Sequence, residues 1–213
     1  MYTQQDKKAK FISLEGTDGS GKSSLRRYIT SSFWDADVKA LSTGPHSFLL
    51  PKHSEIIVDV REGRLHSKEQ ITESYVLDKK EHQDRTIVPS IEKNQWIIAD
   101  RSLVSDIVYH EVVFGIDPFV TYDMQRKLGV KMSDIIVFLD TPPDIAFQRI
   151  NERQTDGFKF WETKETLKRL YDSYNQVLFS GRFPDVPEVK VIDNSGSEKE
   201  TKRQVDQFIK ELI

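Results

Sequence analysis

A short glycine-rich segment carries the clearest chemistry in the sequence. Gly16-Thr17-Asp18-Gly19-Ser20-Gly21-Lys22-Ser23 matches the pattern GxxxxGK(S/T), and Ser24 follows it. In such a segment the glycines let backbone N–H groups surround phosphates, the lysine reaches the β- and γ-phosphates, and the serine hydroxyl can bind Mg²⁺. The segment therefore predicts a site for a nucleoside triphosphate. The alternative is a glycine turn between a strand and a helix, with Lys22 as an ordinary surface lysine.

An acid and an arginine follow an apolar run further along the chain. Asp100 and Arg101 come directly after Trp96–Ala99. Open α/β sheets bind ligands at the carboxyl ends of their strands, so we expect both side chains to lie near the glycine-rich segment. An arginine there can hold a phosphate through two parallel hydrogen bonds. The alternative is that the two residues form only a buried ion pair.

These groups need a scaffold, and the apolar runs of the sequence predict one. Five runs are expected to be buried strands: Phe11–Leu14, Val38–Leu41, Trp96–Ala99, Ile135–Leu139 and Val189–Ile192. They alternate with helical patterns, which favours an α/β fold with a five-stranded parallel sheet and helices on both faces, the three-layer arrangement of P-loop NTPases. The length of 213 residues suits a single domain over residues 1–213. Ser42–Ser54 is expected to be a loop over a site.

Several helix ends can be predicted from local signals. Ser67 with Gln70, and Ser197 with Glu200, match the capping-box pattern and each predict a helix start. Asp140-Thr141-Pro142 predicts a strand end, a cap and a proline at the first helical position. Gly181 is expected just past the end of a helix that contains Leu178.

The composition excludes several classes of function. The 31 basic and 34 acidic residues leave a net charge of -3, which does not suggest a protein that binds nucleic acids. No cysteine is present, so disulfides, thiolate metal sites and cysteine nucleophiles are excluded. No signal peptide and no membrane span is predicted, and we expect a soluble cytoplasmic protein that does not bind membranes. The base-reading Asn-Lys-x-Asp element of GTPases is missing as well, so kinases remain among the P-loop classes.

The sequence resembles the thymidylate kinase family from Phe11 to about Ile192. FISLEGTDGSGKSS resembles the family's phosphate loop with its extra carboxylate, and DRSLVSDIVYH resembles the family segment DRYxxSxxAYQ. FLDTPPDIAFQRINERQTD resembles the fourth strand and the lid, and YVLDKKEHQDRTIVPSIEKNQWIIADR keeps the family spacing of FxAxRxxHxxxxIxPxLxxGxxVxxDR. VIDNSGSEKET resembles the last strand and the loop that borders adenine in the family. The resemblance adds a short lid, at about residues 149–161, to the expected fold.

The resemblance implies roles for individual residues. ATP and Mg²⁺ would be the cofactors, and a nucleoside monophosphate would be the other small-molecule partner. The ATP side would comprise Gly16, Asp18, Gly19, Ser20, Gly21, Lys22, Ser23, Ser24, Arg149 and Ser195, with Ser23 and Asp100 supporting the metal. The acceptor side would comprise Asp18, Tyr75, Lys79, Arg101, Ser105 and Tyr109. Lys22, Asp18, Arg101 and Arg153 would act in catalysis, and Gly19, which stands where one branch of the family has an arginine, favours Arg153 as the catalytic lid arginine.

Several of these residues have simpler interpretations. Arg149 and Arg153 lie four residues apart, so on a helix they would share a face, which could be merely solvated. Tyr75 and Tyr109 could belong to the core. His82 matches a family histidine that we interpret as structural, and none of the five histidines is assigned a catalytic role.

The acceptor side departs from the family pattern. Thr43-Gly44-Pro45-His46 replaces Arg-Glu-Pro-Gly, and Lys79 replaces the base-reading arginine. Ser102 and His110 also stand where tyrosine and glutamine are usual, and a further family arginine could align with Arg61 or Arg64.

The activity that the resemblance implies is ATP-dependent phosphorylation of a deoxynucleoside monophosphate, with dTMP as the leading acceptor, by a homodimer. One alternative is a nucleoside kinase, which would need a general base, and Glu15 is the only residue in about the right place. The other is a nucleotide-binding regulatory protein with weak transfer activity, which the departures on the acceptor side would favour.

Overall fold

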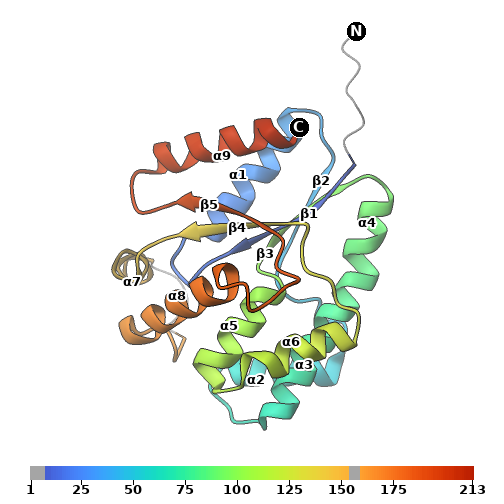
Figure 1. Cartoon of the computed structure of the whole chain (residues 1–213), viewed down its shortest axis with the longest axis vertical. Helices are drawn as coiled ribbons and strands as arrows, with labels where there is room; N and C mark the ends of the chain where they lie inside the picture. Colours follow the sequence, from blue (N-terminus) through green and yellow to red (C-terminus); the bar gives the residue numbers. More distant parts are fainter. Residues whose placement is uncertain (1–7, 154–158) are drawn as a thin grey trace.

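The computed structural model describes residues 8–153 and 159–213, and these residues build one five-stranded parallel sheet (Figure 1). The strand order is β2-β3-β1-β4-β5. The strands are β1 (Phe11–Glu15), β2 (Ala40–Thr43), β3 (Trp96–Asp100), β4 (Ile135–Asp140) and β5 (Glu188–Asp193). The chain runs from β1 to β2 on one side and later to β4 and β5 on the other, so the order reverses at β1. The predicted α/β fold with a five-stranded parallel sheet is confirmed.

Helices cover both faces of this sheet. They are α1 (Lys22–Asp35), α2 (Pro51–Arg61), α3 (Lys68–His82), a π-helical turn η1 (Gln83–Ile87), α4 (Val88–Glu92), α5 (Leu103–Phe114), α6 (Pro118–Lys127), α7 (Pro143–Glu152), α8 (Lys164–Phe179) and α9 (Glu198–Leu212). In Figure 1, α1 and α9 lie above the sheet, and α5, α6 and α8 lie below it.

Alternation along the strands divides the core into two layers. Ile12 and Leu14 of β1 pack with α1 and α9 side chains such as Phe33 and Phe208. Ile136 and Phe138 of β4 face the opposite way, toward α5 and α8. Successive strand side chains point to opposite faces, so a continuous apolar run supplies both layers.

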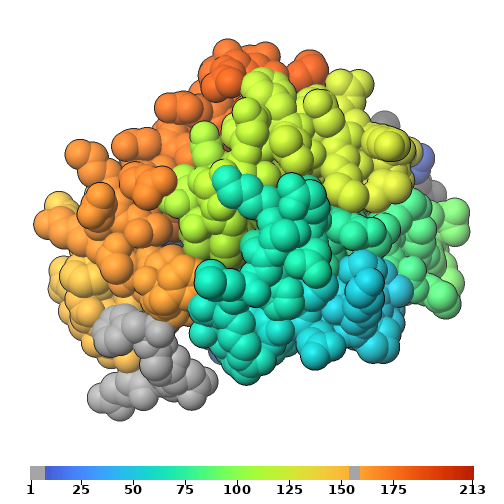
Figure 2. Space-filling view, turned by 90° about the horizontal axis from the view of Figure 1, so that it is seen from below, coloured from blue at the N-terminus to red at the C-terminus, as the bar shows by residue number. Residues whose placement is uncertain are grey.

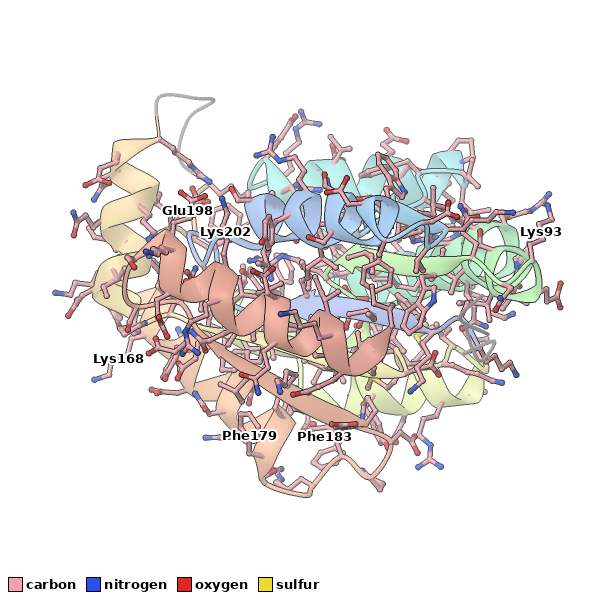
Figure 3. All side chains as sticks on the ribbon, turned by 90° about the horizontal axis from the view of Figure 1, so that it is seen from above. Lys93, Lys168, Phe179, Phe183, Glu198 and Lys202 are labelled. Carbon is pink, nitrogen blue, oxygen red and sulfur yellow. The ribbon has the colours of Figure 1, made fainter. Side chains whose placement is uncertain are left out.

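The two helical layers are visible from opposite sides. Seen from above, α9 runs beside α1, and its labelled residues Glu198 and Lys202 form an i,i+4 ion pair of 2.7 Å (Figure 3). The Lys202 ammonium lies 5.1 Å from the centre of the Tyr28 ring on α1. Seen from below, the α2–α3 region, α5, α6 and α8 form one continuous surface (Figure 2).

Several local predictions need correction. The second strand begins at Ala40 rather than Val38, and the loop predicted over Ser42–Ser54 is shorter because α2 already begins at Pro51. Helix α7 starts one residue later than predicted, at Pro143, because Pro142 rather than Thr141 occupies the cap position.

The fifth strand is less buried than expected. Val191 is 44% exposed, and Ile192 is the one residue of β5 that is fully buried. The reason is its place at the edge of the sheet, where β4 is its only neighbour among the described strands.

The helix ends predicted at Ser67, Ser197 and Gly181 are confirmed. Ser67 forms the complete reciprocal box with Gln70, and the Ser197 side chain accepts a hydrogen bond from the Glu200 N–H. Gly181, with φ of 73°, follows the end of α8. Within the described ranges, no helix is both long enough and apolar enough to cross a membrane.

Candidate active site

The glycine-rich segment forms the loop between β1 and α1. Gly16, Gly19 and Gly21 have φ values of 144°, 77° and 87°, a region that favours glycine because it lacks a Cβ. At Gly19 a Cβ would also collide with the carbonyl oxygen of Ala146 on α7. This packing leaves no room for the arginine that one branch of the thymidylate kinase family, which the sequence resembles, carries at this position.

Lys22 is the first residue of α1 and points back into the loop. Its ammonium donates to the Gly16 and Thr17 carbonyl oxygens at 3.1 and 2.6 Å and to Ser20 Oγ at 3.2 Å. Burial, followed by the nearby Arg101 charge, lowers the pKa of Lys22 to about 7. Lys22 is therefore not a surface lysine, and a simple glycine turn does not account for its place.

Ser23 and Asp100 meet at the mouth of this loop. Ser23 Oγ donates to Asp100 Oδ2 at 2.8 Å, which joins the start of α1 to the end of β3. Hydroxyl and carboxylate oxygens are ligands that Mg²⁺ accepts, although this ion usually keeps water and substrate oxygens as well. Within residues 8–153 and 159–213, no cluster of three or more histidine, aspartate or glutamate side chains could hold a metal by itself.

Arg101 is the centre of the polar network beside the loop. Its backbone has φ of 74°, which is uncommon for a non-glycine residue and often marks a functional position. Its guanidinium donates to five groups at 2.8 to 3.2 Å: Gly16 O, Asp18 Oδ1, Ser105 Oγ, Tyr109 OH and Tyr174 OH. The alternative of an ion pair with Asp100 alone is wrong, because the carboxylate that Arg101 contacts belongs to Asp18.

Asp18 lies among cations and N–H or O–H donors. Lys159 Nζ is 3.2 Å from Oδ1, while Trp161 Nε1 and Tyr109 OH donate to Oδ2 at 3.0 and 3.1 Å. Burial opposes the ionised form, but Arg101, Lys159 and Lys22 together hold the pKa of this carboxyl well below its usual range. Asp18 is therefore a fixed negative charge.

The Glu15 carboxylate is not placed to act as a general base. Its carboxylate is fully buried at the end of β1 and accepts hydrogen bonds from the Ser102 N–H at 2.7 Å and from Ser105 Oγ at 2.5 Å. Ser102 Oγ and Tyr174 OH add two longer contacts of 3.0 and 3.4 Å. A carboxylate enclosed in this way cannot receive a proton from an acceptor hydroxyl without rearrangement, so the nucleoside-kinase alternative loses its candidate base.

A cleft extends from Asp18 and Arg101 along α5. It encloses about 520 Å³ of non-atom space, a figure that includes open solvent. Its charged part is formed by Asp18, Arg101 and Lys159. Other lining residues supply an aromatic wall, namely Tyr75, Tyr109, Phe114 and Trp161, and a further polar group, namely His46, Arg61 and Asp106.

Tyr75 serves both the core and the cleft. It is 7% exposed and packs with Ile56, Ile57 and Val60 of α2, as the core interpretation expects. It also lines the cleft, and its ring meets that of His46 edge-on at a centroid distance of 5.2 Å. The two interpretations of Tyr75 are therefore compatible.

The structure separates the basic residues predicted around the acceptor. The Lys79 ammonium donates to the Pro45 carbonyl and lies 3.7 Å from Asp106 Oδ1, and it lines a small adjoining cavity instead of the cleft itself. Of the two alternative arginines, Arg61 lines the cleft. Arg64 forms ion pairs with Asp59 and Glu62, and its side chain is 62% exposed.

The two lid arginines do not share a face. Arg149 lies in the last turn of α7 and donates to the Asn194 carbonyl at 2.9 Å. Arg153 lies past the helix end with an extended backbone, and it donates to Glu162 Oε2 at 2.5 Å. The prediction of a common, merely solvated helix face is thus wrong. Residues 154–158 of the predicted lid lie outside the described residues.

The remaining predicted residues lie at the edge of the loop. Ser24 is exposed in the first turn of α1, and Ser195 is exposed after β5, with its N–H donating to Asp193 Oδ1 at 2.9 Å. Asn194, which the sequence did not single out, donates from Nδ2 to the Ser20 carbonyl at 2.7 Å. It therefore ties the loop after β5 to the phosphate loop.

The sequence interpretation missed several residues of the cleft. Lys159 and Trp161 fall within the predicted lid range but had no role assigned, and Tyr174, which lies outside the cleft lining, follows no motif. These residues reach Asp18 or Arg101 only through the fold. His46 lies 3.3 Å from Asp78, a contact between residues 32 positions apart that no local spacing could reveal. Burial lowers the pKa of His46 to about 4, so this imidazole is neutral at neutral pH.

Comparisons with known proteins agree with this geometry. The family model described as "Thymidylate kinase" matches residues 14–205. The chain is similar to a thymidylate kinase of Leptospira borgpetersenii, with 30% identity over 171 residues, 79% of this chain and 80% of that protein. It is also similar to thymidylate kinases of Mycoplasmoides gallisepticum, with 27% identity over 89% of this chain and 88% of the relative, and of Symbiobacterium thermophilum, with 27% identity over 95% and 94%. The chain belongs to the thymidylate kinase family.

Proposed function

We propose that this protein transfers the γ-phosphoryl group of ATP to dTMP, giving ADP and dTDP. The observation that carries the proposal is the charged part of the cleft, where Lys22, Arg101 and Lys159 all act on the single carboxylate of Asp18. This excess of positive charge next to a phosphate loop suits an acceptor phosphate facing a triphosphate. The choice of dTMP is supported by the family and by the names of the relatives.

The reaction needs positioning more than covalent help from the protein. Phosphoryl transfer passes through a loose in-line transition state whose charge spreads over the γ-oxygens. Lys22 would stabilise that charge from the donor side, and Arg101 would hold the acceptor phosphate that attacks. The acceptor oxygen is already ionised, so no general base is required, which agrees with the enclosed position of Glu15.

Asp18 would orient the acceptor rather than take part in bond making. Its carboxylate is fixed by Tyr109 and Trp161 and lies at the cleft, where it can accept a hydrogen bond from a sugar hydroxyl. Tyr75 and Tyr109 would contact the base and the sugar through their ring faces. Ser105 lines the same cleft and would contact the sugar side.

The oxygen pair of Ser23 and Asp100 fits a magnesium ion. We propose that Ser23 would contact the ion directly and that Asp100 would support it through water. A bound Mg²⁺ would neutralise phosphate charge and help to align the two nucleotides. The Ser23–Asp100 hydrogen bond of 2.8 Å already holds the two oxygens together.

Arg153 is the lid arginine that we propose for catalysis. The side chain of its present partner, Glu162, is fully buried. The ion pair with Glu162 keeps Arg153 next to the Lys159–Trp161 segment, which contacts Asp18. If the Arg153 side chain moved from Glu162 to the γ-phosphate, its positive charge would lie where negative charge develops in the transition state. Arg149, held at Asn194, would remain on the nucleotide side of the lid.

The experiment is a coupled assay of ADP release with ATP, Mg²⁺ and a panel of nucleoside monophosphates and nucleosides. We expect turnover that depends on dTMP and exceeds turnover with thymidine by orders of magnitude. Turnover with nucleosides alone would favour the nucleoside-kinase alternative. Tight ATP binding without turnover of any acceptor would favour the regulatory alternative and contradict the proposal.

We also propose that the protein works as a homodimer, as the resemblance to the family implies. Light scattering on the purified chain across a range of concentrations tests this point, and a mass of one chain at all concentrations would contradict it.

A further inference from the structure

One buried carboxyl group in the cleft lacks a complete set of partners. Asp106 lies on α5 next to Ser105 and lines the cleft, although the residue is only 4% exposed. Its Oδ2 atom is buried and has no hydrogen-bond partner among the described residues. Buried polar atoms are nearly always paired, so an unpaired carboxyl oxygen in a ligand pocket needs an explanation.

A neighbouring carboxylate shows that the chain can satisfy such a group. Asp78 is fully buried and accepts hydrogen bonds from the Ser47 N–H and Oγ, from the Phe48 N–H and from His46. Every one of those donors belongs to the loop between β2 and α2. Asp106 has no such set of donors, so its Oδ2 atom is left without a hydrogen-bond partner among the described residues, in a residue that lines the cleft.

The groups around Asp106 leave this oxygen ready to accept. The nearest cation is the Lys79 ammonium, which lies 3.7 Å from the other oxygen, Oδ1, and already donates to Pro45. Burial raises the pKa of the Asp106 carboxyl to about 7, so the group is mostly ionised at mildly alkaline pH. The charged groups that act on it are Lys79, Glu15, Asp78 and Arg101.

We propose that Asp106 determines which base the acceptor carries, by accepting a hydrogen bond through Oδ2 from an N–H group on the edge of a pyrimidine. The inference rests on the proposed function, because it assumes that the base of the acceptor nucleotide enters this cleft. Tyr75, on the wall of the same cleft, provides an aromatic surface for the ring. Asp106 thus takes a specificity role that Lys79, turned toward Pro45, does not fill.

Two pyrimidine edges carry the required donor. Thymine and uracil have an imide N3–H between two carbonyl groups, and cytosine has a 4-amino group beside an unprotonated N3. A base that offers neither would bury the carboxylate oxygen against a group that cannot donate, and sites built around a polar partner reject such analogues strongly. Hydrogen bonds to charged groups are strong enough to give discrimination of about 10- to 100-fold.

The test compares kcat and KM for four acceptors, dTMP, N3-methyl-dTMP, dCMP and N4,N4-dimethyl-dCMP, at about pH 8.5, above the Asp106 pKa of about 7. The proteins are the unaltered chain, Asp106→Asn and Asp106→Val. Asparagine keeps an oxygen acceptor of the same size, whereas valine keeps the bulk and removes the acceptor. Asp123→Val, on the exposed side of α6, is the matched control and should leave all constants unchanged.

We expect the unaltered protein to prefer one parent nucleotide over its methylated analogue by about 10-fold or more, mainly through KM. Asp106→Val should bring that preference close to one, with kcat for the parent lowered only slightly, and Asp106→Asn should keep most of it. A preference within the dTMP pair identifies the imide donor, and one within the dCMP pair identifies the amino donor.

A structural role alone would raise KM for a parent and its analogue equally. If Asp106→Val keeps both preferences within about threefold of the unaltered protein, the inference is wrong while the kinase assignment stands. If no monophosphate is turned over by the unaltered protein, the proposed function itself fails. The preference is a ratio measured on one protein sample, so partial misfolding of a variant does not change it.

Discussion

The phosphate loop and the base-side wall of the cleft are built in opposite ways. The base-side wall comprises the cleft residues His46, Tyr75 and Asp106, together with Asp78 and His110, which contact His46 and Tyr75, respectively. The loop is one segment, Gly16–Ser23, whose groups are mostly backbone atoms and whose lysine bonds to residues within six positions of itself. The wall draws on separate segments, and its contacts join residues such as His46 and Asp78, 32 positions apart. One region is therefore encoded locally, and the other exists only once the chain has folded.

This difference has a physical cause. A phosphate is recognised by N–H groups and a helix start, which any sequence with glycines at the right positions can present. A base edge is recognised by side chains held in a buried place, and each of these needs partners from other elements. Of the departures from the family pattern, His46 lies in the wall, whereas Lys79 lines an adjoining cavity, where its ammonium is 3.7 Å from Asp106 Oδ1.

The largest effect is expected on the donor side. Lys22→Ala should lower kcat by about 10²- to 10³-fold, because it removes a preorganised charge from the developing transition state. Binding of dTMP, measured by calorimetry without ATP, should change little. Steady-state ADP release gives the rate, and Lys52→Ala, at an exposed lysine of α2, is the control. Activity that survives Lys22→Ala would show that the phosphate loop is not the donor site.

Arg101→Lys is the corresponding change on the acceptor side. We expect kcat/KM for dTMP to fall by about 10- to 100-fold, since an ammonium cannot replace the paired donors of a guanidinium. The dissociation constant of ATP should stay within about threefold. An equal loss of ATP affinity would mean that Arg101 binds the donor nucleotide rather than the acceptor phosphate. Arg85→Lys, whose side chain is 70% exposed, is the control.

The fold was predictable because its signals are local or periodic. Apolar runs located all five strands to within about two residues, and the Ser67 and Ser197 caps fixed two helix starts. The edge position of β5 was not predictable, because the sequence does not state the strand order. Thr141 was mistaken for a cap because two prolines follow it, and the choice between them depends on backbone geometry.

For the candidate site, the sequence indicated which residues lie in one region better than it indicated which groups they contact. Placing Asp100 and Arg101 at the same strand end suggested an ion pair, but a strand end directs adjacent side chains apart, and Arg101 turns to Asp18 instead. Lys159 and Trp161 reach Asp18 from 141 and 143 positions away. Such contacts depend on how α7 and α8 pack, which no motif encodes.

A pH experiment tests the base-side wall by itself. His110 is buried against Tyr75, and burial lowers the pKa of its imidazole from 6.5 to about 3. Below pH 6.5 the unfolded chain gains a proton that the folded protein does not, so stability is lost as pH falls toward 3. Between about pH 7.5 and about pH 5 this should cost about 2 kcal/mol of unfolding free energy.

The variant for this experiment is His110→Gln, which can keep the hydrogen bond to Thr121. Its unfolding free energy, from urea titrations, should fall less than that of the unaltered protein over the same pH interval. An equal fall in both proteins would show that His110 is protonated in the folded state. The base-side wall would then gain a positive charge as the pH falls instead of staying neutral.

The smallest effect is expected from two arginines that the sequence could not tell apart. Arg61 lines the cleft, whereas Arg64 is held by Asp59 and Glu62 at the surface. Arg61→Gln should raise KM for dTMP by about 10-fold with little change in kcat, the typical loss of one partly solvated contact to a charged ligand. Arg64→Gln should leave both constants unchanged, because exposed ion pairs contribute little. A reversed result would mean that the α2–α3 connection reorganises when the acceptor binds, so that the base-side wall is completed by the ligand rather than by the folded chain alone.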